Sequence, residues 1–139
     1  MLIYTLAGGD DEPEGPPKAA IVDQLSLTFP NEDFSSEATG LLEAAGYEVE
    51  YIPGEQVTVD FYRTLPQRDY DFVLLRSHAG RYESNGVQTE DAPLFTSEFY
   101  SQTRHLDDQR ANRLTISLYE DERLNDDNAY FSIPAEFVQ

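Results

Sequence analysis

The chain offers few side chains for acid–base chemistry, because it has two histidines and no cysteine. His78 follows a largely apolar run over residues 70–75, and Gly80 stands two positions after it. Such a run is typical of a strand buried on both faces of a sheet. In open α/β sheets, ligands bind just beyond the carboxyl ends of the strands, so His78 is a candidate proton acceptor. The alternative is a histidine that only closes a loop through hydrogen bonds to the backbone.

Other polar residues near these positions carry weaker signals. Ser77 and His78 are neighbours on a strand, so their side chains point to opposite faces and no serine dyad is predicted. His105 lies in a polar stretch and is predicted to be a surface histidine. Arg76 could bind an acidic substrate group, but pairing with one of the many carboxylates is the favoured interpretation. Without cysteine, thiol catalysis, zinc thiolate sites and disulfides cannot arise within this chain.

No cofactor and no metal site is predicted. The acidic residues are spread along the chain without the spacing of a calcium loop. Gly8, Gly9 and Gly15 do not lie in a strand-to-helix turn, so no phosphate loop is predicted. Asp23 ends the first predicted strand, as an acidic residue does in receiver domains. The third strand ends in Arg-Ser-His instead of an aspartate, which argues against a receiver.

The charge of the chain excludes several partners. Asp and Glu number 27 against 9 Lys and Arg, giving −18 and a pI near 4.1, and Lys18 is the single lysine. Such a surface repels nucleic acid and anionic membranes, so neither is expected as a partner. Acid excess with almost no lysine is typical of a protein built for high salt, with a calcium-rich setting as the weaker alternative. The compartment stays open between cytoplasm and anchorage through an upstream segment.

The segments that position His78 alternate between strand and helix patterns. We expect a parallel sheet in which the first strand lies between the second and third, order 2-1-3, within a three-layer αβα architecture. Asn31 or Asp33 is predicted to cap the first helix, Gly46 to end it, and Thr58 to cap the second. The predicted elements are strand 19–23, a helix after residue 31, strand 47–52, a short helix after residue 58, and strand 70–76.

The ends of the chain and its second half are less regular. Residues 1–17 are predicted to be an acidic Gly/Pro linker, and residues 18–139 a single α/β domain. Residues 1–7 are apolar but too short to span a bilayer. After a polar loop, a β-extension is expected, which includes a possible hairpin. Its predicted strands are 94–101 and 114–119, followed by a short strand at 130–133 and a first helical turn at 134–138. The fold therefore looks incomplete, and self-association through exposed apolar surface is expected.

Three segments together resemble the first half of a caspase-like domain. These are residues 19–25, 44–49 and 70–80, and the resemblance covers residues 18–80. The family is the clan CD group of cysteine peptidases, which includes caspases, gingipains, clostripain and CHAT domains. Its catalytic base is a histidine just after the third strand, usually followed within two residues by glycine. The resemblance therefore implies that His78 is the general base and Gly80 the turn residue after it.

The nucleophile of that family is a cysteine at the end of the fourth strand, which this chain lacks. One hypothesis is the histidine-bearing half of a cysteine peptidase-type domain, a hydrolase only when a downstream segment or a separate half supplies the thiol. The isolated chain is then expected to be inactive. The alternative is a non-catalytic caspase-like binding module from a high-salt organism, with residues 81–130 as the protein-contacting extension. Either hypothesis expects a protein or peptide as partner.

Overall fold

The computed structural model describes residues 2–5, 15–80, 83–84, 87–88, 92–118 and 129–138. The chain divides into two compact units. Unit 1 consists of Met1–Val57 with Pro66–Ser77, and unit 2 of Thr58–Leu65 with His78–Gln139. The two units are described separately below, and the assignment of residues 18–139 to one domain stays a prediction.

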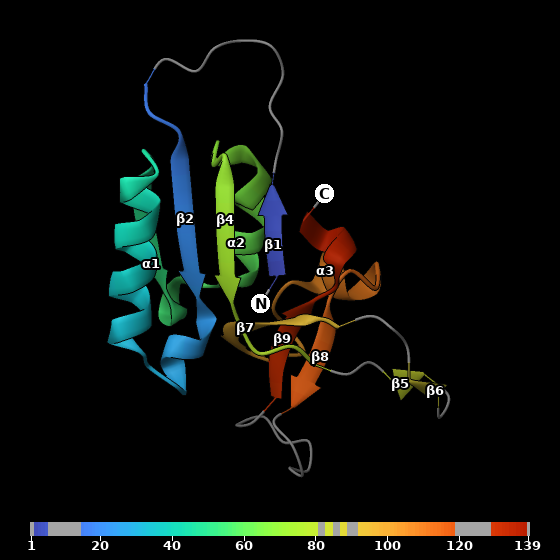
Figure 1. Cartoon of the computed structure of the whole chain (residues 1–139). Coiled ribbons are helices and arrows are strands. Elements are labelled where there is room, and N and C mark those ends of the chain that lie inside the picture. Colours follow the sequence, from blue (N-terminus) through green and yellow to red (C-terminus); the bar gives the residue numbers. More distant parts are fainter. Residues whose placement is uncertain are drawn as a thin grey trace. The chain divides into compact units, whose positions relative to one another are not determined.

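The sheet of unit 1 confirms the α/β fold and the strand order expected from the sequence. Strand β2 (Lys18–Asp23) pairs in parallel with β3 (Glu48–Pro53) on one side and with β4 (Phe72–Arg76) on the other (Figure 1). This is the 2-1-3 order. The register places Asp23 opposite both Pro53 and Arg76, so the three parallel strands end level with one another.

Burial explains why these segments form the sheet. Five of the six residues of β2 are buried, as are the three central residues of β4, which is typical of central parallel strands. Helix α1 (Glu32–Ala44) packs against β2 and β3. Asn31 caps it, because its side chain accepts a hydrogen bond of 3.0 Å from the backbone N–H of Phe34. Gly46 follows the helix with φ +93°, as the sequence predicts. Short 3-10 helices complete the unit: η1 (Gln24–Leu27), η2 (Gly54–Gln56) and, shared with the boundary of unit 2, η3 (Leu65–Gln67).

A fourth strand corrects the linker prediction at the N-terminus. Strand β1 (Leu2–Thr5) pairs antiparallel with β4, with Leu2 opposite Leu75 and Thr5 opposite Phe72. The sheet order is therefore β1-β4-β2-β3 (Figure 1). A buried strand such as β4 needs hydrogen-bond partners on both edges, and the apolar start of the chain supplies the second edge. The rest of the predicted linker, residues 6–14, lies outside the described residues.

Unit 2 contains the β-extension that the sequence predicts, in a different arrangement. Strand β9 (Ala129–Ile133) pairs antiparallel with both β7 (Leu94–Phe99) and β8 (Thr115–Leu118). It lies between them, so the possible hairpin of β7 with β8 is wrong. Thr58 caps α2 (Val59–Thr64) as predicted and accepts from the N–H of Phe61 at 3.0 Å. The remaining elements are β5 (Glu83–Ser84), β6 (Val87–Gln88), α3 (Leu106–Arg110) and the 3-10 helix η4 (Ala135–Val138).

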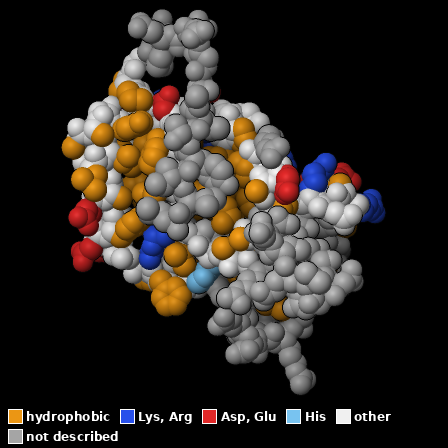
Figure 2. All heavy atoms as spheres, turned by 45° about the vertical axis from the view of Figure 1, so that its right-hand side comes forward, with side chains coloured by type: hydrophobic (Ala, Val, Ile, Leu, Met, Phe, Trp, Pro, Cys, Tyr) orange, Lys and Arg blue, Asp and Glu red, His pale blue; other side chains and the backbone are white. Residues whose placement is uncertain are grey.

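Several large hydrophobic side chains are exposed on the described surface. Figure 2 shows a broad group of hydrophobic side chains on one face of the molecule. In unit 1, Phe29 is 63% exposed and Leu41 on α1 is 67% exposed. No residue of α1 is fully buried. Exposed apolar surface of this kind is a common feature of protein-binding faces, and it motivates the expected self-association.

Candidate functional site

Asp23 is fixed at the carboxyl end of β2 by two strong hydrogen bonds. Its side chain is 1% exposed. Arg76 Nη1 donates to Oδ1 at 2.7 Å, and the hydroxyl of Tyr51 donates to Oδ2 at 2.9 Å. Burial and this hydrogen bond to Asp23 raise the pKa of Tyr51. Both carboxylate oxygens of Asp23 are thus engaged within the sheet, which makes this residue an anchor of the strand ends.

Arg76 closes the same strand ends and uses its guanidinium within the protein. Besides Asp23, it donates through Nη2 to the carbonyl oxygen of Phe29 at 2.6 Å, and its guanidinium carbon lies 5.4 Å from the centre of the Phe34 ring. The interpretation of Arg76 as the partner of a carboxylate is confirmed. The next hydroxyl along the chain, that of Ser77, donates to Gln24 Oε1 at 3.3 Å. Ser77 is therefore held by a side chain of η1.

His78 follows β4 by two residues and begins the second segment of unit 2. It is half-buried, and its ring centre lies 5.7 Å from that of Phe95, with the planes at 53°. Its carbonyl oxygen accepts a 3.1 Å hydrogen bond from the N–H of Phe95. Burial lowers the pKa of His78 below its usual value. The imidazole is consequently neutral at pH 7, the state in which it can accept a proton.

Gly80 serves the chain differently from the turn that the sequence predicts. Residues 78–80 run antiparallel to residues 93–95: the N–H of Gly80 donates to Pro93 O at 2.8 Å, and Ala79 bridges to Leu94. The φ angle of Gly80 lies outside the left-handed region, so no turn requires it. A Cβ at this position would lie 2.8 Å from the hydroxyl oxygen of Ser117. Gly80 lies on the same segment as His78, and its lack of a side chain permits a close contact with Ser117.

His105 corrects the prediction of a surface histidine. It is half-buried, with Nε2 3.1 Å from Glu98 Oε1 and its ring edge-on to Phe131 at 5.3 Å. The second oxygen of Glu98 accepts a 2.6 Å hydrogen bond from the N–H of Val59 at the start of α2. The sequence carries no local signal for this site, because β7 departs from regular pairing between Phe95 and Phe99 and the partners of Glu98 come from other segments.

The two predicted site residues, His78 and Gly80, come together on one extended segment, while Asp23, Arg76 and Ser77 are engaged within unit 1. In the described ranges, no three His, Asp or Glu side chains are grouped so that they could hold a metal ion. None of the described helices has the length and apolar character needed to cross a membrane. Comparison with family models, with curated proteins and with solved structures finds no match for this chain.

Proposed function

We propose that this chain supplies the histidine-bearing half of a caspase-like, cysteine peptidase-type site, with His78 as general base. The observation that carries the proposal is the position of His78 in the chain, two residues beyond the carboxyl end of β4, which with β2 and β3 forms the parallel part of the sheet in the order 2-1-3. The lowered pKa of His78 supports it, because a neutral imidazole accepts the thiol proton at neutral pH. The thiol comes from outside these 139 residues, which contain no cysteine.

In the proposed chemistry, the imidazole of His78 accepts a proton from the thiol and later gives it to the leaving group. A cysteine Sγ within hydrogen-bond reach of the imidazole passes its proton to the ring, and the thiolate attacks the scissile carbonyl carbon. The imidazolium then returns the proton to the leaving amine, and water hydrolyses the acyl-enzyme. The antiparallel hydrogen bonds that join residues 78–80 to 93–95 keep the base in place during both transfers.

The edge of β4 that faces away from β2 limits how a further strand could join this sheet. Strand β1 occupies that edge through four residue pairs. A further strand that brings a thiol to this sheet beside β4 must therefore displace β1 or pair beyond it. This supports the expectation that the 139-residue chain is inactive by itself.

The test joins the chain to the cysteine-bearing segment that the proposal requires, encoded after Gln139 or as a separate chain, and assays thiol-dependent peptide cleavage in molar KCl. We expect His78→Ala to reduce the rate by about 100- to 10,000-fold while the melting temperature stays near that of the parent. His105→Ala is the matched control, because it removes the other imidazole and should leave cleavage largely intact. Cleavage that survives His78→Ala would sink the proposal.

A non-catalytic caspase-like interaction module is the second candidate, favoured by the exposed apolar side chains of unit 1. Leu27 and Phe29, in and beside η1, are 44% and 63% exposed, and a peptide or protein partner would cover them. This candidate predicts that the Leu27→Ser/Phe29→Ser double variant lowers self-association in light scattering.

The −18 charge supports a high-salt habitat for the protein. We therefore expect its melting temperature to rise with KCl concentration into the molar range. A melting temperature that does not change with KCl would contradict this.

A further inference from the structure

Unit 2 holds a second cluster of charged side chains that takes no part in the proposed peptidase chemistry. At its centre is Asp108, of which the side chain is 10% exposed. Arg113 donates to Oδ1 from Nε at 2.8 Å and from Nη2 at 2.7 Å, and Arg63 donates to Oδ2. Burial acts to raise the pKa of Asp108, but the hydrogen bonds to both arginines outweigh it and hold that pKa below its usual range. The carboxylate of Asp108 thus binds two guanidinium groups.

The arginines of this cluster border a cavity of about 530 Å³. Its polar lining consists of Arg63, Thr103, His105, Asp107, Asp108, Arg110 and Arg113. Arg63 also pairs with Asp60, three residues earlier on the same helix. Among the described residues no carboxylate pairs with Arg110, while Asp108 already serves two arginines. Three of the nine basic residues of a strongly acidic chain therefore meet at one cavity. We refer to it as the arginine cavity.

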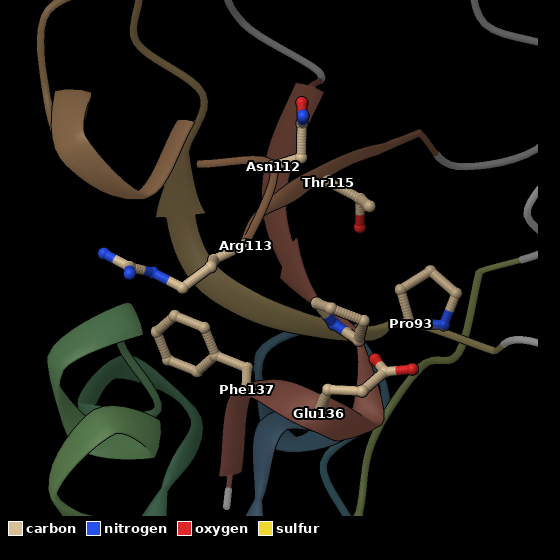
Figure 3. A pocket seen from close by; sticks show the side chains of 7 residues that line it. Pro93, Asn112, Arg113, Thr115, Glu136 and Phe137 are labelled. Carbon is tan, nitrogen blue, oxygen red and sulfur yellow. The ribbon is translucent and has the colours of Figure 1, made fainter. Parts of the chain in front are cut away.

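A second cavity shares Arg113 with the arginine cavity. This second cavity, of about 390 Å³, is lined by Pro93, Phe137 and the stem of Arg113 among others. In Figure 3 the side chain of Arg113 extends past the ring of Phe137 and away from Glu136 and Pro93. Arg113 lines both cavities, and Asp108 holds its guanidinium at the arginine cavity.

The geometry points to an oxyanion site in the arginine cavity that takes a phosphate group of a small molecule. Arg63 of α2, Arg110 of α3 and Arg113 after α3 line it from separate elements, and Thr103 adds a hydroxyl whose oxygen lies 3.2 Å from that of Ser101. Several separate donors match a phosphate, which has several free oxygens, better than a planar carboxylate, which one guanidinium can satisfy. A long nucleic acid is excluded, because the −18 charge repels it, whereas a small anion meets only the local field.

The experiment is a calorimetric titration of the 139-residue chain with inorganic pyrophosphate, at the lowest KCl concentration that keeps the chain folded. We expect saturable 1:1 binding with a dissociation constant at or below about 1 mM. Arg110→Gln should weaken binding about tenfold, because it removes one charged donor and breaks no ion pair of the described residues. Arg68→Gln, an exposed arginine in unit 1, is the matched control and should bind as the parent does.

Three results would overturn this inference: no binding by the parent up to about 10 mM pyrophosphate, equal affinity in the parent and in Arg110→Gln, or citrate binding as tightly as pyrophosphate. Circular dichroism of each variant separates loss of binding from loss of fold. Because His78 does not line the arginine cavity, failure of this inference leaves the proposed peptidase role unaffected.

Discussion

The two histidines of unit 2 are placed in contrasting surroundings. His78 packs against the ring of Phe95, and burial lowers its pKa. His105 also packs against an aromatic ring, that of Phe131, but its Nε2 lies 3.1 Å from a carboxylate oxygen of Glu98. Burial beside Phe95 lowers the pKa of the first ring and favours its neutral form, the form that can act as a base. A carboxylate contact ties the second ring to the framework, which indicates a structural role.

The largest expected effect comes from breaking the framework around His105. Glu98→Ala removes the acceptor for the N–H of Val59, a residue with no exposed surface, together with the partner of His105. A buried N–H without an acceptor costs about 1–3 kcal/mol, so we expect the variant to lose about 3 kcal/mol of unfolding free energy in denaturant titrations.

Glu98→Gln is the matched control for that prediction. It retains a carbonyl oxygen for Val59 and should cost about 1 kcal/mol. Equal losses in both variants would show that the hydrogen bond to Val59 contributes nothing, and the framework interpretation of Glu98 and His105 would then be wrong.

A smaller effect is expected on the side of His78, at Gly80. In Gly80→Ala the new methyl group meets the hydroxyl of Ser117 at 2.8 Å, so either the hydroxyl or the segment 78–80 has to shift. Crowding of this kind costs about 1–3 kcal/mol.

Removing the obstructing oxygen tests the cause. The double variant Gly80→Ala/Ser117→Ala should recover part of the loss, as measured by a double-mutant cycle. Strict additivity of the two single variants would contradict a contact between Gly80 and Ser117.

The contrast between the two histidines also marks what the sequence can predict. The strands 19–23, 47–52 and 70–76, and the caps at Asn31 and Thr58, were predicted because their signals are local: burial runs, capping residues and turn residues. The 2-1-3 order followed from the handedness of parallel crossovers.

Pairings between distant segments left no such local signal. Strand β1 reaches β4 across about seventy residues, and β9 enters between β7 and β8, for which a hairpin was one possibility from the sequence. Glu98 contacts Val59, 39 positions earlier in the chain, and that contact fixes the partner of His105. Such pairings depend on which edges and buried donors remain unsatisfied after the local elements form, which only the assembled structure shows.

The smallest effect is a pH dependence specific to His78. Because burial lowers its pKa in the folded state, the unfolded chain binds more protons at this residue as the pH falls below about 6.5. The stabilisation from the neutral ring is therefore complete above that value and is lost as the pH falls toward the folded-state pKa. We expect His78→Phe to fill the same place beside Phe95 and to remove this part of the pH dependence of the unfolding free energy between pH 7 and 5.

His105→Phe is the comparison at the other site, and ring proton shifts in NMR should report a titration midpoint below 6.5 for His78. A midpoint at or above 6.5 would mean that His78 is hydrated like an exposed histidine, and the contrast drawn here between the two sites would not hold.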